Sequence, residues 1–197
     1  MNTKIILGSG SPRRKELLAN LGFTFEVRTK DTDESYPSKM TCEEVPTFLA
    51  KQKANALLPE LSSNELLICA DTVVILDNQI LGKPANKEEA ITMLNSLSGN
   101  KHDVITGVFI GNSKKQLVFS EKTAVTFNKL SQTDINHYID NYQPFDKAGS
   151  YGIQEWIGAI GITKIIGSYA NVMGLPTHKV YELLTTDFQL KTIQITH

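Results

Sequence analysis

A run of mostly apolar residues from Leu66 to Leu76 constrains the fold of this chain of 197 residues more than any other segment. Its aliphatic and β-branched members are typical of a strand that is covered on both faces in the middle of a sheet. Asp71 and Thr72 interrupt the run, and a carboxylate in such surroundings is costly unless it is paired or bound to a metal. Asp71 therefore marks a candidate site. The alternative is a buried aspartate that accepts backbone hydrogen bonds at a strand end.

The rest of the chain alternates strands with helices at first and then contains hairpins, which predicts an α/β fold with a mixed twisted sheet flanked by helices. A turn at Asp77-Asn78 is expected to form a hairpin, and the glycine-containing segment 146–154 is expected to be a loop. Further strands are predicted at 4–7, 23–27, 104–110 and 117–127. Helices are predicted from Pro12 to near Gly22, at 45–58, from Asn86 to near Ser98, at 131–142 and at 176–185. The helix at 45–58 is preceded by a capping box at Thr41 and Glu44. The segment 160–166 is either a short strand or a helix turn.

Composition indicates one ordinary globular domain over residues 1–197, with 41% hydrophobic and 21% charged residues. The net charge of -1 and the aromatic content of 8% argue against a nucleic-acid-binding protein. The first residues contain no apolar stretch long enough for a signal peptide or a membrane span, so a cytoplasmic location is expected. Cys42 and Cys69 are expected to be reduced thiols, and the histidines show no zinc-like spacing.

The segment Ser9-Gly10-Ser11-Pro12-Arg13-Arg14 connects the first predicted strand to a helix in which Ser11 is the N-cap and Pro12 takes the first position. Such a turn directs backbone N–H groups and a helix N-terminus at one point, where an anion can bind. Two arginines in a first helical turn oppose the helix dipole unless an anion neutralises them. The alternative is a pair of solvated surface arginines. The segment fits neither the dinucleotide-binding glycine motif nor a Walker loop.

A lysine on the predicted helix at 45–58 is also unusual in its position. Lys53 lies four residues after Leu49 and three before Ala56, so it projects from the face that packs on the core. A lysine there requires an anionic partner or a cleft. The acidic segment 31–37, by contrast, is predicted from its composition to be a solvated loop.

Taken in order along the chain, these segments closely resemble the Maf family of nucleotide pyrophosphatases. The matching residues are Ser9 to Arg14, Asp33-Glu34, Lys53, Asp71-Thr72-Val73-Val74, Gly82-Lys83-Pro84 and Asp146-Lys147-Ala148-Gly149-Ser150-Tyr151-Gly152-Ile153-Gln154. Each segment alone is a weak signal, but their order over most of the chain makes coincidence improbable.

The resemblance implies a fold like that of the inosine triphosphate pyrophosphatases, with two lobes around a cleft, a homodimer and a divalent cation such as Mg²⁺ or Mn²⁺. The implied reaction converts a nucleoside triphosphate and water into the monophosphate and pyrophosphate. It assigns triphosphate binding to Arg13, Arg14, Lys53 and Lys83, with Ser9 in the same turn. Glu34 and Asp71 are assigned to the metal and the attacking water, and Asp71 is the implied proton acceptor. Whether Asp71 acts as ligand, base or both in turn remains open at this point.

Within the family, one branch acts on dTTP and UTP and another on 7-methyl-GTP. Arg13, Thr72 and Gln154 match the first branch, so dTTP, UTP and modified pyrimidines such as 5-methyl-UTP or pseudouridine triphosphate are the expected substrates. A side-chain amide such as that of Gln154 both donates and accepts, as the O4/N3–H edge of thymine or uracil requires. The family's association with arrest of septum formation leaves a non-catalytic regulator as the alternative function.

Overall fold

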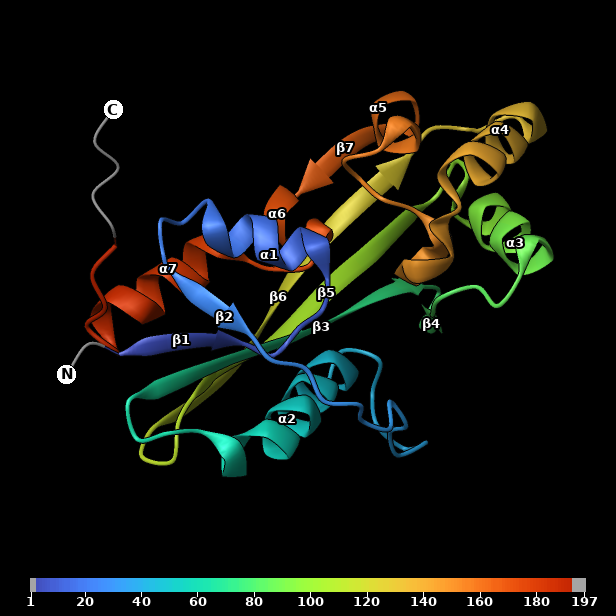
Figure 1. Ribbon diagram of the computed structural model, residues 1–197. Coiled ribbons are helices and arrows are strands. Elements are labelled where there is room, and N and C mark those ends of the chain that lie inside the picture. Colours follow the sequence, from blue (N-terminus) through green and yellow to red (C-terminus); the bar gives the residue numbers. More distant parts are fainter. Residues whose placement is uncertain (1–2, 193–197) are drawn as a thin grey trace, which may run out of the picture. The chain divides into compact units, whose positions relative to one another are not determined.

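The computed structural model describes residues 3–192, which form one seven-stranded sheet and its flanking helices (Figure 1). The strands are β1 (Lys4–Leu7), β2 (Phe25–Val27), β3 (Glu65–Leu76), β4 (Gln79–Leu81), β5 (Lys101–Gly111), β6 (Gln116–Phe127) and β7 (Ile162–Ile166). The α-helices are α1 (Pro12–Ala19), α2 (Val45–Leu57), α3 (Lys87–Leu97), α4 (Gln132–Tyr142), α5 (Trp156–Gly161), α6 (Tyr169–Met173) and α7 (Thr177–Thr186). Short 3₁₀ turns occupy Leu58–Glu60, Pro144–Asp146 and Ala148–Ser150.

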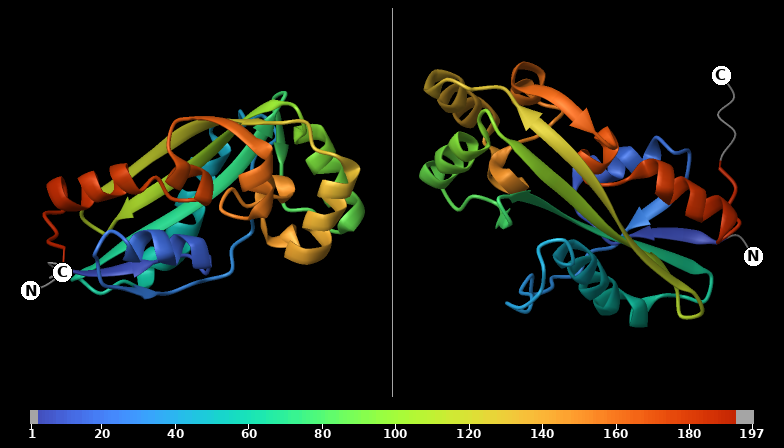
Figure 2. Two further views of the ribbon diagram at one scale, coloured as in Figure 1. Left: turned by 90° about the horizontal axis from the view of Figure 1, so that it is seen from above. Right: turned by 180° about the vertical axis from the view of Figure 1, so that it is seen from behind.

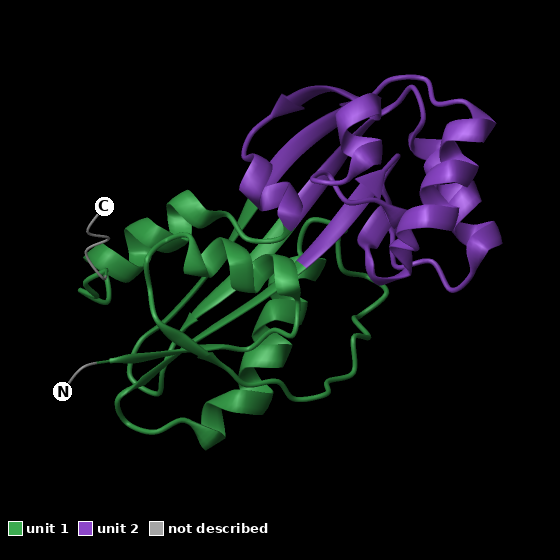
Figure 3. Ribbon diagram, turned by 45° about the horizontal axis from the view of Figure 1, so that its top comes forward, with its two compact units in different colours: residues 1–71, 106–121, 174–197 green, residues 72–105, 122–173 purple. Residues whose placement is uncertain are grey.

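The chain divides into two compact units (Figure 3). The first comprises residues 1–71, 106–121 and 174–197, and the second comprises residues 72–105 and 122–173. The strand order is β2-β1-β3-β5-β6-β7, with β4 paired to β3, so β3, β5 and β6 each contribute residues to both units.

Parallel pairing in the first unit brings several strand ends to one edge of the sheet. β1 pairs in parallel with β2 and with β3, and Leu7 lies opposite Val27 on one side and Ile68 on the other. Connections that follow parallel strands leave from the same edge, which is where ligands bind in open α/β sheets. The turn after β1 and the segment after β2 therefore begin next to each other.

Close approach of the turn after β1 to β3 depends on a glycine. Gly8 donates its N–H to the Ile68 carbonyl over 2.8 Å, and a Cβ at this position would lie 2.4 Å from the Cys69 sulfur. The turn then enters α1 as predicted, because Pro12 occupies its first turn and the Ser11 hydroxyl accepts a hydrogen bond from the Arg14 N–H over 3.5 Å. Both cysteines are thiols, and burial raises the pKa of Cys69 to about 12.

The second unit contains antiparallel pairs and a helical layer. β4 and β7 run antiparallel to β3 and β6 respectively, and the β3–β4 turn at Asp77-Asn78 has positive φ angles of 48° and 62°, as its sequence predicts. Helices α3 and α4 lie side by side, as both views of Figure 2 show. Within residues 3–192 there is no helix of the length and apolarity that a membrane crossing requires.

The structure confirms the predicted order of the main strands and helices and corrects several details. Thr41 and Glu44 bond to each other, but in a turn before α2, which begins at Val45 because Pro46 suits a first helical turn. The segment at 160–166 comprises the end of α5 and the strand β7. Helix α6 was not predicted, since five residues carry too little periodicity to be recognised.

A histidine lies in the aromatic core of the second unit. His102 is 2% exposed, stacks on Phe127 with ring centroids 5.6 Å apart, and has its Nε2 atom 2.7 Å from the Tyr151 hydroxyl. Burial lowers the pKa of His102 to about 4, although the neighbouring Asp103 acts in the opposite direction. His102 is therefore neutral in the folded protein at pH 7.

This buried histidine predicts a loss of stability in acid. The ordinary histidine pKa is 6.5 and the folded value is about 4, so between these values only the unfolded chain binds the proton. The free energy of unfolding should fall by up to about 3 kcal/mol as the pH drops from about 6.5 towards 4. Urea titrations across this pH range should show that the free energy of unfolding depends less steeply on pH in His102→Gln than in the wild type. His178→Gln, at an exposed position, should retain the dependence of the wild type. Equal slopes in wild type and His102→Gln would refute the assignment.

Candidate functional site

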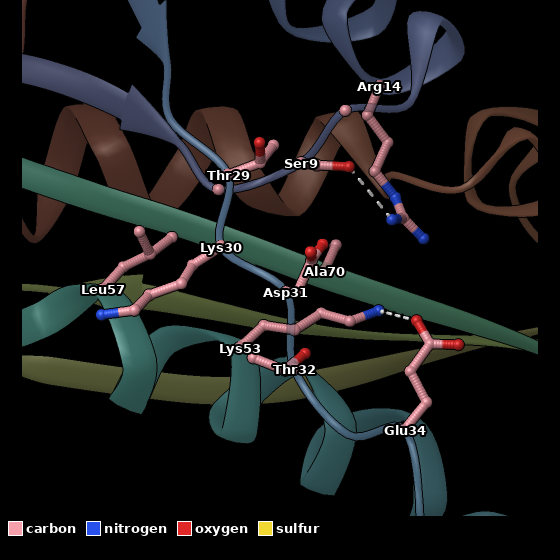
Figure 4. Close-up of a pocket in the computed structure, with 12 residues that line it drawn as sticks. Ser9, Arg14, Thr29, Lys30, Asp31, Thr32, Glu34, Lys53, Leu57 and Ala70 are labelled. Atoms are coloured by element: carbon pink, nitrogen blue, oxygen red, sulfur yellow. Dashed lines mark hydrogen bonds and ion pairs between the residues drawn. The ribbon is translucent and has the colours of Figure 1, made fainter.

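A pocket in the first unit lies where the turn after β1, the segment after β2, helix α2 and strand β3 meet (Figure 4). Its lining comes from four separate stretches of the chain, and three of them carry predicted site residues. The lining residues are Gly8, Ser9, Gly10, Arg14, Thr29, Lys30, Asp31, Thr32, Glu34, Lys53, Leu57 and Ala70. Cationic and anionic side chains thus face the same small space.

Lys53 joins two carboxylates at this pocket. Its Nζ atom lies 2.5 Å from Asp71 Oδ1 and 2.9 Å from Glu34 Oε1, and Figure 4 shows the Lys53 and Glu34 side chains pointing toward each other. The Lys53 and Asp71 side chains are only 18% and 13% exposed, whereas Glu34 is half exposed. The prediction that Lys53 requires an anionic partner is confirmed, and Asp71 is paired rather than isolated.

The charge state of Lys53 follows from two opposing effects. Burial alone lowers the pKa of an ammonium group. The nearby Asp71 charge, the hydrogen bonds to Asp71 and Glu34, and the Glu34 charge together outweigh it, so the pKa of Lys53 is raised above its ordinary value. Lys53 is therefore a permanent cation at neutral pH.

Arg14 is held in a fixed direction beside the same turn. Its Nε atom donates to the Gly174 carbonyl over 2.8 Å, and its Nη1 atom donates to the Ser9 hydroxyl over 3.3 Å (Figure 4). Burial lowers the pKa of Arg14 and the neighbouring Arg13 lowers it further, whereas the negative charge of Asp71 acts in the opposite direction. An arginine still remains protonated. The buried hydroxyl of Ser9 thus orients a cation at the N-terminus of α1.

Asp71 contacts Lys53 but does not itself line the pocket, and four further predicted site residues also lie outside it. Arg13 is on α1 next to Arg14 but is not among the lining residues. Thr72, Lys83 and Gln154 belong to the second unit, where Thr72 directly follows Asp71 on β3 and Lys83 follows β4. The Gly149 N–H donates to the Gly82 carbonyl over 3.0 Å, which joins the segment carrying Lys83 to the loop carrying Gln154.

Sequence reasoning missed the lining residues of the segment after β2, Thr29, Lys30, Asp31 and Thr32. Composition favoured a solvated loop for residues 31–37, and these residues are indeed without regular structure. The signal that identifies them is topological: a segment that follows a strand parallel to β1 must leave from the edge where the Gly/Ser turn lies.

The donor set determines what kind of cation this site suits. Among residues 3–192 no group of three or more histidine, cysteine, aspartate or glutamate side chains is arranged to hold a metal ion. Glu34 and Asp71 converge on one ammonium group, and Mg²⁺ typically takes one or two protein carboxylates and completes its coordination with phosphate oxygens and water. The two carboxylates therefore fit a divalent cation that binds together with a phosphate ligand.

Comparisons with known proteins agree with the motifs. The family model described as Maf-like protein matches residues 4–187. A dTTP/UTP pyrophosphatase from Flavobacterium psychrophilum is 54% identical over 180 residues, covering 91% of this chain and 92% of the relative. A dTTP/UTP pyrophosphatase from Parabacteroides distasonis is 52% identical over 182 residues, covering 92% and 94%. A HAM1 protein from Coxiella burnetii aligns with a TM-score of 0.50 at 13% identity, over 93% of this chain and 98% of that one. It confirms the fold predicted by resemblance to the inosine triphosphate pyrophosphatases.

The shared ammonium group predicts energetic coupling between Lys53 and Asp71. Lys53→Met should lower the free energy of unfolding by roughly 1–3 kcal/mol, because it leaves a poorly exposed carboxylate without its cation. Adding Asp71→Asn should recover part of this loss, since the uncompensated charge is then removed. Urea denaturation of the two single variants and the double variant measures the coupling. Strictly additive effects would show that the two side chains do not stabilise each other.

Proposed function

Because this chain belongs to the Maf family, we propose that it is a pyrophosphatase that hydrolyses dTTP and UTP to the nucleoside monophosphate and pyrophosphate. Two relatives named dTTP/UTP pyrophosphatase share more than half of their aligned residues with it over nearly the whole chain. The structural observation that carries the proposal is the convergence of Lys53, Asp71 and Glu34 beside the Gly/Ser turn.

The triphosphate is bound by the turn and the cations next to it. Backbone N–H groups at the start of α1 and the charge of Arg14 favour an anion in the pocket, and Lys53 adds a second partly buried cation. Arg13 on α1 and Lys83 in the second unit complete the set of cations that we assign to the phosphates. Such charges stabilise the negative charge that develops on the leaving pyrophosphate.

Asp71 accepts the proton of the attacking water in this mechanism. Lys53 fixes the direction of this carboxylate through the 2.5 Å contact to Oδ1. We further assign a divalent cation, Mg²⁺ or Mn²⁺, to Glu34 and Asp71. When bound, it supplies positive charge at the phosphate oxygens and makes water more acidic. A carboxylate that orients the water, rather than one tightly coordinated, is the better base.

Selection of the nucleobase of the substrate is assigned to Gln154, Thr72 and Arg13. The Gln154 side chain is exposed, and its amide both donates and accepts, which matches the O4/N3–H edge of thymine or uracil. Modified pyrimidines with the same edge, such as 5-methyl-UTP and pseudouridine triphosphate, are accepted on the same grounds. We also propose that the active form is a homodimer, that the reaction occurs in the cytoplasm, and that its role is removal of aberrant nucleotides.

The assignment of Asp71 predicts a variant that is folded but inactive. Asp71→Asn should lower kcat for dTTP by about 10²–10⁴-fold, because the amide cannot accept the proton. Circular dichroism and thermal unfolding should confirm that it still folds. Asp187→Asn serves as the matched control and should retain full activity. Asp187 lies at the end of α7 and is paired with Lys115. A near-normal rate in Asp71→Asn would exclude Asp71 from the mechanism. Growth effects that persist in this variant would favour a regulator.

The assignment of the substrate predicts an order of rates. Pyrophosphate release should be fastest with dTTP and UTP, slower with dCTP and purine triphosphates, and slow with 7-methyl-GTP, because cytosine lacks the O4/N3–H edge assigned to the Gln154 amide and the purine bases are larger. A nucleotide panel with Mg²⁺, Mn²⁺ or a chelator measures this directly, and the chelator should abolish release. Faster turnover of 7-methyl-GTP than of dTTP would contradict the proposed specificity.

A further inference from the structure

A hydrogen-bonded network in the second unit fixes the loop that carries Gln154. The Gly152 N–H donates to the Tyr138 hydroxyl over 3.0 Å, and this hydroxyl in turn donates to Glu155 Oε2. The other carboxylate oxygen, Oε1, lies 3.2 Å from Lys147 Nζ. Glu155 therefore connects helix α4, through Tyr138, with the beginning and the end of the loop.

Burial makes these contacts stronger than ordinary surface pairs. Tyr138 is fully buried, the Lys147 side chain is 9% exposed and that of Glu155 is 20% exposed. Ion pairs at exposed positions are screened by water and contribute little, whereas removal of one partner of a desolvated pair is costly. Lys147 also contacts Asp146 Oδ1 at 2.6 Å, but that carboxylate is more than half exposed. Glu155 is thus its better shielded partner.

Gly152 brings the carboxylate of Glu155 and the amide of Gln154 to the same place. A Cβ on Gly152 would lie 2.7 Å from Glu155 Cδ and 3.0 Å from Gln154 Nε2. Both side chains therefore fold over the bare backbone of this glycine. The Glu155 N–H also donates to the Gly152 carbonyl over 3.0 Å, which closes a tight turn around Gln154.

We propose that Glu155 is a positioning residue for base recognition, held by Tyr138 and Lys147 so that the turn from Gly152 to Glu155 presents the Gln154 amide in one orientation. This inference rests on the proposed function, in which Gln154 binds the pyrimidine edge. A hydrogen-bonding group that is held in the productive geometry binds its ligand without first losing conformational freedom. Glu155 itself need not touch the nucleotide.

The test is a kinetic comparison of Glu155 variants. Glu155→Ala should raise KM for dTTP and UTP about fivefold at unchanged kcat, since the amide interaction lost is a binding interaction present equally in the ground state and the transition state. Glu155→Gln retains the length of the side chain and an oxygen for the Tyr138 hydroxyl, so it should show a smaller increase. The matched control is Asp140→Asn. Asp140 lies on the same helix as Tyr138, and its exposed carboxylate is paired with Lys87. This variant should behave as wild type.

A double-mutant cycle separates positioning from a general effect on folding. In a Gln154→Ala background, Glu155→Ala should raise KM no further, because there is no amide left to orient. An unchanged KM in Glu155→Ala, a fall in kcat alone, or the same KM increase in the Gln154→Ala background would each overturn the inference. If Glu155→Ala does not fold, the same criteria apply to Glu155→Gln. A wild-type protein that turns over neither dTTP nor UTP would instead refute the proposed function, and this inference with it.

Discussion

The pairing of Lys53 with Asp71 is the interaction on which the site depends. A carboxylate in the middle of β3 would be costly in an apolar strand, and a lysine on the inner face of α2 would be costly for the same reason. Each makes the other acceptable at a separation of 2.5 Å, and Glu34 adds a second carboxylate from the segment after β2. Such a pair is weak evidence for stability but strong evidence for a site, because replacement by apolar residues would be a simpler solution for a structural core.

Sequence patterns predicted the framework well because they depend on local physics. The β3 run, the Ser11 cap followed by Pro12, and the Asp77-Asn78 hairpin turn are all set by neighbours in the chain, and the structure confirms each of them. Lys53 and Asp71 were identified individually because each conflicts with its apolar surroundings. Their mutual contact was not predictable, since it depends on how α2 packs on β3. The pocket segment 29–32 was missed for the same reason: its composition is that of a solvated loop, and only the parallel pairing of β1 and β2 places it at the site.

The residues assigned to the phosphates and those assigned to the nucleobase are held by different kinds of interaction. In the first unit, charges converge on a turn whose backbone can bind an anion, and Ser9 restricts Arg14 through one hydrogen bond. In the second unit, the exposed Gln154 precedes Glu155, which contacts a tyrosine and a lysine that are themselves largely buried. An attraction between full charges tolerates small displacements, whereas discrimination between bases requires a precisely oriented amide. The denser network accordingly lies beside the residue assigned to the base.

The boundary between the two units falls inside β3, between Asp71 and Thr72, with no intervening linker residues. Successive residues of a strand point to opposite faces, so a single inserted or deleted residue at this junction would reverse the facing of every side chain that follows it in the strand. Domains joined by loops can gain or lose residues at their junction during evolution. Here the two units are joined within one strand, so the alternation of that strand fixes the number of residues between Asp71 and Thr72 and the side chains that follow.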